Sequence, residues 1–314
     1  MKVLVTGGAG FIGSNFIHYW FGRHPKDEIV NIDKLTYAAD PRNLDGVNKY
    51  KYQFIKEDIV NRRVVEKIIK DVDVVVNFAA ESHVDKSITD TSEFIHSNIV
   101  GVHSLLEAVR KYEKRFHQIS TDEVYGSLQL KTKKKFNECS PYLPRNPYSA
   151  TKAAADHLVR SYVNTYGINA TISNCSNNFG PRQHVEKLIP ETITSGLVNR
   201  KIPIHGTGVQ VRDWIYVEDH CSAIEKILRK GRYGETYLVG ANHEMSVIDI
   251  VRFILGHLGR GEELIIFTKD RPGQDLRYAI DPSKIMSELG WRQKHRFEDS
   301  IKRTIEWYKE KYQM

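Results

Sequence analysis

The sequence predicts an α/β protein built on a doubly wound parallel sheet. Strand-like and helix-like segments alternate through the first half of the chain, which is the pattern of such sheets. Several strand-like segments are continuous runs of apolar, β-branched residues, as expected for parallel strands buried on both faces. A glycine-rich segment, TGGAGFIGS (6–14), joins the first strand-like run to the first helix-like run.

The elements follow from hydrophobic periodicity, taken in chain order. Strands are expected at 2–7, 28–33, 52–58, 72–80, 115–120 and 169–175, and helices at 14–24, 62–71, 93–112 and 148–166. After about residue 178, Gly/Pro-rich stretches separate shorter elements. We therefore expect a first domain over 1–177 and a smaller α/β domain over 178–314. The strand-like run 235–240 suggests a return to the main sheet around 213–240.

Composition narrows the function classes. The chain has 314 residues and a net charge of +7. Its three cysteines form no CxxC pair, and this pattern favours reduced thiols and a cytoplasmic location. It begins directly on a strand-like run, so no signal peptide is expected, and no run of about 18 apolar residues predicts a membrane span. The thirteen histidines show no metal-ligand spacing, so no metal is expected. The basic residues are spread out, and KTKKK (131–135) is interpreted as a solvated loop. Anionic metabolites are therefore favoured over nucleic acid as partners.

The glycine-rich segment predicts a dinucleotide site. Gly7, Gly10 and Gly13 form GxxGxxG at the first strand–helix turn, where missing Cβ atoms let the backbone approach a pyrophosphate. The helix that follows directs its unpaired N–H groups at the phosphates. Asp33 stands twenty residues later, where a carboxylate accepts from ribose hydroxyls and repels a 2′-phosphate. This arrangement favours NAD over NADP; the alternative is a set of turn glycines and a surface aspartate.

A tyrosine–lysine pair predicts a general base. Only Tyr52 and Tyr148 have a lysine four positions later, and Tyr52 lies in a strand pattern, where four residues span about 13 Å. Tyr148 begins an alanine-rich helical run, in which Lys152 lies on the same face. We expect the ammonium and a cationic nicotinamide to lower the pKa of the phenol, so that it acts as a base near neutral pH. The alternative is an exposed tyrosine with an incidental lysine.

Two adjacent carboxylates follow a predicted strand in the segment STDEVYG (120–126). Asp122 and Glu123 come directly after the hydroxyl of Thr121. Neighbouring like charges raise one another's pKa, so one group can stay protonated while the other is ionised. An acid–base pair is therefore expected here, although a turn after a strand would also account for the aspartate.

Together these motifs resemble the extended short-chain dehydrogenase/reductase family, whose fold is of the Rossmann type. Within it the chain is most similar to the dTDP-glucose 4,6-dehydratases, over nearly its whole length. The segments that carry the resemblance are GGAGFIGSNF, NIDKLTYA, NFAAESHVDKSI, STDEVYG, NPYSATKAAADHLVRSY, NCSNNFGP, EKLIP, VRDWIYVEDH and RPGQDLRYAIDPSKI. The Thr-Asp-Glu triplet distinguishes these dehydratases from the sugar-nucleotide epimerases, which share the fold, the tyrosine and the lysine.

The resemblance implies a complete reaction. NAD takes a hydride from sugar C4 while Tyr148 takes the O4 proton and Thr121 steadies that oxygen. Glu123 removes the C5 proton, and Asp122 protonates the departing 6-hydroxyl. The hydride then returns to C6 and a proton to C5, so NAD is regenerated and dTDP-glucose becomes dTDP-4-keto-6-deoxyglucose.

The resemblance also implies binding residues, including Tyr148 and Lys152 for both chemistry and cofactor. For NAD they are Gly7, Gly10, Phe11, Ile12, Gly13, Asp33, Lys34, Leu35, Thr36, Asp58, Ile59, Phe78, Ala79, Ala80, Ser82, Ser97 and Asn178. For the sugar nucleotide they are Ser82, Thr121, Asn177, Lys187, Leu188, Pro203, Ile204, His205, Arg212, His243, Arg271 and Gln274. Family members usually carry Asn and His where this chain has His243 and Gln274, which leaves dTDP against UDP open.

Three other readings remain. They are a UDP-sugar 4,6-dehydratase, a UDP-glucose 4-epimerase and a non-catalytic NAD-sensing binding protein. The intact Thr-Asp-Glu, Tyr and Lys set argues against the last. The resemblance further implies a homodimer formed by the helices around 93–112 and 148–166.

Overall fold

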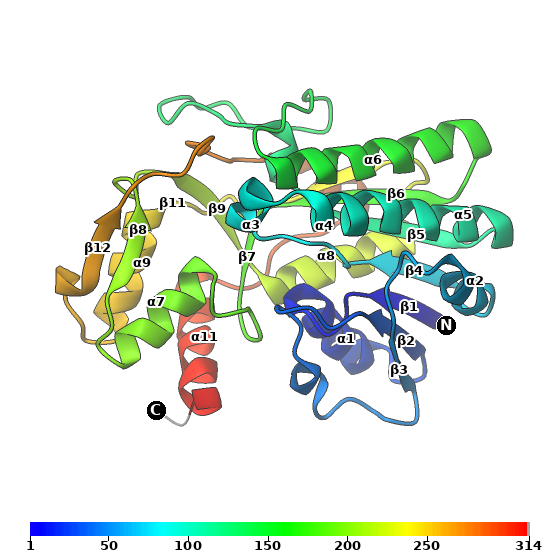
Figure 1. Cartoon of the computed structure of the whole chain (residues 1–314), viewed down its shortest axis with the longest axis horizontal. Helices are drawn as coiled ribbons and strands as arrows, with labels where there is room; N and C mark the ends of the chain where they lie inside the picture. Colours follow the sequence, from blue (N-terminus) through cyan, green and yellow to red (C-terminus); the bar gives the residue numbers. More distant parts are fainter. Residues whose placement is uncertain (313–314) are drawn as a thin grey trace.

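A seven-stranded parallel sheet forms the centre of the computed structural model, which describes residues 1–312 (Figure 1). The strand order is β10-β6-β5-β4-β1-β2-β3, and each neighbouring pair is parallel. The order runs outward in both directions from β1, which leaves a crevice at the carboxyl ends of β1 and β4. The strands are β1 (Lys2–Thr6), β2 (Glu28–Asp33), β3 (Tyr52–Lys56), β4 (Val74–Asn77), β5 (Arg115–Thr121), β6 (Ala170–Cys175) and β10 (Thr236–Val239). The predicted fold class is confirmed.

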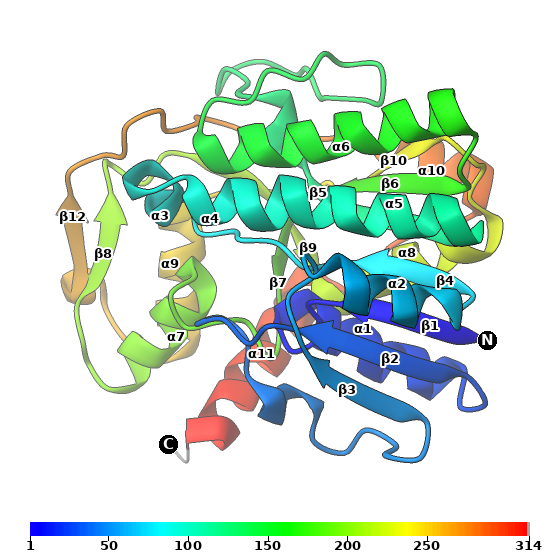
Figure 2. The same ribbon diagram turned by 45° about the vertical axis from the view of Figure 1, so that its right-hand side comes forward.

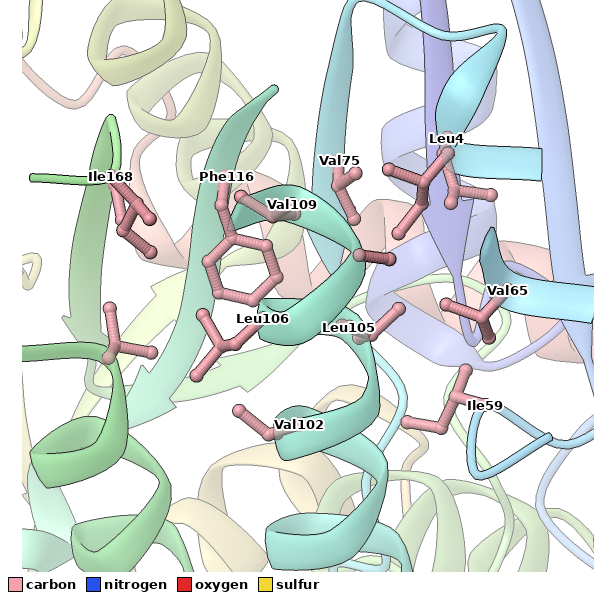
Figure 3. Close-up of a cluster of buried hydrophobic side chains, with 14 of the residues drawn as sticks. Leu4, Ile59, Val65, Val75, Val102, Leu105, Leu106, Val109, Phe116 and Ile168 are labelled. Atoms are coloured by element: carbon pink, nitrogen blue, oxygen red, sulfur yellow. The ribbon is translucent and has the colours of Figure 1, made fainter. Parts of the chain in front are cut away.

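Helices cover both faces of this sheet. Leu4 of β1 packs against the first layer, whereas Val3 and Val5 pack against the second, because successive side chains of a strand point to opposite faces. Figure 3 shows the first of these cores, where Leu105, Val109 and Phe116 meet. The first layer contains α2 (Arg62–Lys70), α5 (Val102–Tyr112) and α6 (Pro147–Tyr166), and the second contains α1 (Phe11–Arg23) and α8 (Val217–Lys230).

The long helix predicted at 93–112 is present but interrupted. It comprises α4 (Ser92–Ile95), π-helical turns over His96–Gly101 and then α5. Gly101 fits here because a Cβ would lie 2.5 Å from the Ile59 side chain. The wider turns bury Ser97 and Asn98, and the Asn98 amide donates to the Glu81 carbonyl and to Thr151. π-turns of this kind are common at functional sites.

The second half builds a smaller α/β unit beyond the carboxyl ends of the sheet strands (Figures 1 and 2). Three strands form a mixed sheet in the order β11-β9-β7, and β8 and β12 form a parallel pair. These strands are β7 (Asn177–Phe179), β8 (Ile202–His205), β9 (Val211–Tyr216), β11 (Glu244–Ser246) and β12 (Ile265–Thr268). The remaining helices are α3 (Val84–Thr89), α7 (Leu188–Leu197), α9 (Val247–His257), α10 (Ser283–Leu289) and α11 (Phe297–Tyr312).

Between these elements the chain returns to the main sheet. After β9 it forms α8 against the second face and then β10, which extends the sheet beyond β6. The predicted strand at 72–80 ends earlier, at Asn77, because residues 78–80 leave the sheet to line the crevice. No helix within 1–312 has the length and apolar character needed to cross a bilayer.

Candidate active site

A continuous cleft lies at the carboxyl ends of the sheet strands. Its first part is a cavity of about 310 Å³ beside the glycine-rich loop, and its second part, of about 250 Å³, extends toward the smaller unit. Volumes of this size suit small ligands. Residues from both halves of the chain line both parts, and they are Ser82, Glu123, Asn177, Asn178, Gln183, Glu186 and Lys187.

The glycine-rich loop is shaped for close backbone approach. Gly7 has φ +68°, and a Cβ there would lie 2.7 Å from the Ala79 nitrogen. A Cβ on Gly13 would lie 2.5 Å from the Gly7 carbonyl oxygen. Gly10 begins α1 without any side-chain cap, so N–H groups of the first turn remain available to a phosphate.

Asp33 lies at the end of β2, where it faces the first cavity. Its carboxylate accepts from the backbone N–H groups of Ala9 (2.9 Å) and Leu35 (2.8 Å). Burial raises the pKa of Asp33, and these two hydrogen bonds oppose the rise. Leu35 does not line the cavity, contrary to expectation; it adopts a left-handed conformation (φ 59°) and holds Asp33 through its N–H. The neighbouring Lys34 donates to Ser97 at 2.9 Å.

Thr121, Tyr148 and Lys152 meet in the first cavity. Thr121 ends β5, whereas Tyr148 and Lys152 lie one turn apart near the start of α6. The Lys152 ammonium donates to the Ile119 carbonyl at 2.7 Å. The pKa of Tyr148 is raised, first by burial and then by the Glu123 carboxylate. The direction is opposite to the expected lowering, because desolvation of a phenolate outweighs the hydrogen bond with Thr121 that favours it.

The adjacent carboxyl groups both face the first cavity. They follow β5 in a single 3₁₀ turn, Asp122–Tyr125, and both side chains line the cavity. Asp122 is 1% exposed, and its Oδ2 atom has no hydrogen-bond partner. Glu123 also faces the second cavity and accepts from the Asn146 amide at 3.4 Å.

The two carboxyl groups differ in their tendency to hold a proton. Burial, reinforced by the charge of Glu123, raises the pKa of Asp122 well above its usual range. Burial also raises the pKa of Glu123, but the Arg212 guanidinium opposes the rise. Arg212 opposes the rise at both groups, but at Glu123 it is second only to burial, whereas at Asp122 the negative charges of Glu123 and Asp213 outweigh it.

The predicted cofactor residues gather around the first cavity. Its lining residues among them are Gly7, Gly10, Phe11, Ile12, Gly13, Asp33, Lys34, Thr36, Asp58, Ile59, Phe78, Ala79, Ala80, Ser82, Ser97, Tyr148, Lys152 and Asn178.

The second cavity collects basic residues. Lys187 donates to the Ser82 carbonyl at 3.1 Å, and Arg271 pairs with Asp85 at 2.8 Å. The Arg212 guanidinium lies 4.2 Å from the centre of the Tyr278 ring. Guanidinium groups are suited to a diphosphate. The predicted substrate residues that line this cavity are Ser82, Asn177, Lys187, Leu188, Pro203, Ile204, His205, Arg212, Arg271 and Gln274.

His243 is outside the cleft, so its assignment to the substrate is corrected. Its ring stacks on Phe297 with centroids 4.2 Å apart, and its backbone N–H donates to Asp213 at 2.7 Å. The smaller unit therefore uses this side chain for packing.

Several cleft residues were not predicted. Asn146 caps α6 through its side chain and also donates to Glu123, and the Asn-Pro pair before an alanine-rich helix was the available signal. Tyr278 and Glu186 come from loops whose sequences carry no local pattern. No three His, Cys, Asp or Glu side chains within 1–312 converge on a metal site.

Comparisons with known proteins agree on one family. A model described as GDP-mannose 4,6 dehydratase matches residues 4–304. A dTDP-glucose 4,6-dehydratase of Mycolicibacterium smegmatis is 49% identical over 98% of this chain and 93% of its own length. The dTDP-glucose 4,6-dehydratase DesIV of Streptomyces venezuelae, solved with NAD and TYD bound, is 40% identical with a TM-score of 0.95, covering 99% of this chain and 97% of its own. The enzyme of Bacillus anthracis, solved with NAD, is 43% identical with a TM-score of 0.93, covering 100% and 98%.

Proposed function

The chain belongs to the family described as GDP-mannose 4,6 dehydratase, and from that membership we propose that it is a dTDP-glucose 4,6-dehydratase. The product is dTDP-4-keto-6-deoxyglucose, released with water. The observation that carries this proposal is the placement of Asp122, Glu123, Thr121 and Tyr148 around one cavity. Each of the proton transfers that the reaction needs then has a residue of suitable chemistry within reach.

NAD fits the first cavity. The glycines at 7 and 13 leave no room for a side chain, α1 offers unpaired N–H groups, and Asp33 is fixed where a ribose hydroxyl would bind. When bound, NAD supplies the acceptor of hydride from sugar C4 and the donor of hydride to C6. Lys152 and Tyr148 lie at the end of this cavity next to Thr121.

The side chains divide the proton transfers among them. Tyr148 takes the proton from O4, and Thr121 orients the same oxygen. Because burial raises the pKa of Tyr148, the positive charges of Lys152 and of the oxidised cofactor must offset this rise. Glu123, which Arg212 favours in its ionised form, removes the proton from C5, made acidic by the new ketone. Asp122, held protonated, delivers a proton to the departing O6. When the hydride returns to C6, a proton returns to C5, and Glu123, which removed it, would supply it.

Two residues that depart from the usual family pattern, His243 and Gln274, bear on nucleotide choice. His243 stacks on Phe297 and lines neither cavity, which supports dTDP. A UDP-sugar dehydratase remains the second candidate because Gln274 lines the second cavity. A 4-epimerase reaction does not use the acid–base pair Asp122 and Glu123. A non-catalytic binding protein does not use the Tyr148–Lys152 pair.

We also propose a cytoplasmic homodimer. The cysteine content supports a reducing compartment. The helices expected at the dimer interface, α4 to α5 and α6, lie side by side on one outer face of the sheet (Figure 2).

The test is a substrate panel. The purified protein, supplied with dTDP-, UDP-, GDP- and CDP-glucose, is expected to convert dTDP-glucose most efficiently to a product that absorbs in strong alkali, without net NADH. Deuterium placed at C4 should reappear at C6. A galactose-configured product without a ketone would instead identify an epimerase, and a preference for UDP-glucose would correct the nucleotide.

A further inference from the structure

A buried carboxylate, Asp156, lies behind the first cavity and has no task in the mechanism above. It is fully buried (0% exposed) and lines neither part of the cleft. It follows Lys152 by one turn of α6 and Tyr148 by two, so the three side chains share one side of the helix. Burying a carboxylate costs desolvation free energy, so a role for Asp156 is expected.

Asp156 joins α6 to the strand ends that carry the active site. Its Oδ2 atom accepts from Ser120 Oγ at 2.7 Å, Tyr142 Oη at 2.9 Å and Asn174 Nδ2 at 3.2 Å. The same Asn174 amide donates to the Thr121 carbonyl at 3.1 Å. The carboxylate therefore fixes the end of β5, at the residue that steadies the substrate oxygen. The Oδ1 atom has no partner.

Asp156 is also the source of negative charge near the buried ammonium of Lys152. That ammonium is buried, and its hydrogen bond goes to a neutral carbonyl; it forms no ion pair with any described residue. Burial lowers the pKa of Lys152, and Asp156 is the foremost charge that opposes this lowering. A buried lysine without a negative neighbour tends to lose its proton.

We propose that Asp156 is a positioning residue that holds the Thr121 end of β5 against α6 and supplies the buried negative charge that keeps Lys152 an ammonium ion. The inference rests on the proposed dehydratase function, in which Lys152 acts as a cation beside Tyr148.

The other titratable groups around Lys152 and Asp156 do not replace Asp156 as the negative charge that favours the ammonium. Burial raises the pKa of the Cys175 thiol to about 12, so this neighbour of Lys152 is neutral. Burial raises the pKa of Asp156, and the Lys152 ammonium, the hydrogen bond from Ser120 and the Arg160 guanidinium oppose this rise. Arg160, one turn beyond Asp156, donates to the Tyr142 hydroxyl at 2.7 Å. The remaining groups that face Tyr148, Lys152 or Asp156 are Asp122, Glu123 and Tyr125 from the turn after β5, and Tyr142 from the loop before α6.

The Asp156→Asn variant removes the negative charge of the carboxylate and keeps its hydrogen bonds. Since Oδ1 has no partner, the amide nitrogen can take its place while the amide oxygen keeps the three contacts of Oδ2. Tyr142→Phe is the matched variant, because it removes one of those contacts and keeps the charge. The pH dependence of kcat with dTDP-glucose is measured on each holoenzyme. Carbamylation of Lys152 by cyanate, which attacks only the neutral amine, is followed against pH by peptide mass spectrometry.

The expected result follows from the sign of the interaction. Activity that needs the ammonium is lost as pH rises through the pKa of Lys152, and loss of the Asp156 charge lowers that pKa. In Asp156→Asn, the alkaline limb of kcat and the midpoint of labelling should both move to lower pH by about one unit, or roughly tenfold in rate on that limb. Tyr142→Phe should leave both positions unchanged, and Asp219→Asn, a buried carboxylate on α8 away from the cleft, should do the same.

The inference would be overturned if the pH profiles of kcat and of Lys152 labelling were unshifted in Asp156→Asn. It would also be overturned if Tyr142→Phe shifted both profiles equally. If Asp156→Asn does not fold, labelling of the wild-type chain decides, because a Lys152 that reacts as a neutral amine at neutral pH contradicts a counter-ion. A wild-type enzyme inactive on every sugar nucleotide would refute the proposed function instead, while the labelling result would still stand on its own.

Discussion

Asp122 illustrates how a single residue can serve catalysis at the expense of stability. Its carboxyl is almost fully buried with one oxygen unpartnered, so ionisation is opposed in the folded chain. A carboxyl whose folded pKa is raised contributes stability below its unfolded pKa of about 3.9, and this contribution is lost as pH rises through the folded value. At neutral and higher pH, where the unfolded chain ionises this group freely, the buried carboxyl of Asp122 therefore lowers the stability of the fold.

Asp122→Asn should accordingly be inactive and more stable. The gain in free energy of unfolding is expected on the order of 1 kcal/mol at pH 8, or about 2–4 °C in Tm, and should shrink toward zero near pH 4. Thermal unfolding of both proteins at matched cofactor occupancy across this pH range provides the measurement. A variant that is less stable at every pH would show that Asp122 has a partner when ionised.

Sequence spacing was informative wherever a helix or a strand end fixes the geometry. Tyr148 and Lys152 share a helix face, and Thr121 to Glu123 follow a strand, so both sets reach the cleft. His243 could not be placed, because whether a loop side chain enters a cleft or stacks on Phe297 depends on packing between distant segments. The pKa of Tyr148 was missed for a related reason, since burial is invisible in a local pattern.

At the scale of elements, α1 offers a contrast between two glycines. Gly13 packs its backbone against Gly7 and Gly8 with no space for a Cβ, whereas nothing lies within 4 Å of a Cβ added to Gly22 in the same helix. Gly13→Ala should destabilise the fold by about 1–3 kcal/mol, because the backbone must shift, and should weaken NAD binding. Gly22→Ala should leave NAD binding unchanged and add about 0.5 kcal/mol of stability.

Denaturant unfolding and NAD titration calorimetry of the two variants would check this contrast. Equal NAD affinities would mean that the tight turn is unimportant for the cofactor. Periodicity predicted the helix that contains both glycines but began it at 14, three residues late, because the cap is a glycine without a polar side chain. The π-turns within 93–112 were likewise unpredictable, since local periodicity does not show that Gly101 packs closely against the distant Ile59.

For the whole molecule, the testable feature is assembly. Ile95 (47% exposed) and Val100 (44% exposed) lie on the helical segment expected at the dimer interface. The protein should sediment at about twice its 36.2 kDa, and Ile95→Glu combined with Val100→Glu should yield monomers. Phe267→Glu, at a more exposed position on β12 (61% exposed), should remain dimeric. A wild-type monomer in sedimentation velocity would remove the dimer from the proposal.

The position of β10 has a consequence for biosynthesis. A nascent chain leaves the ribosome from its N-terminus, so six strands of the main sheet emerge well before the seventh, which is separated from β6 by β7, β8, β9 and α8. During that interval β6 presents an open edge that is buried in the finished protein, and such edges recruit other chains. We therefore expect ribosome-associated chaperones to bind the six-stranded intermediate at the exposed edge of β6.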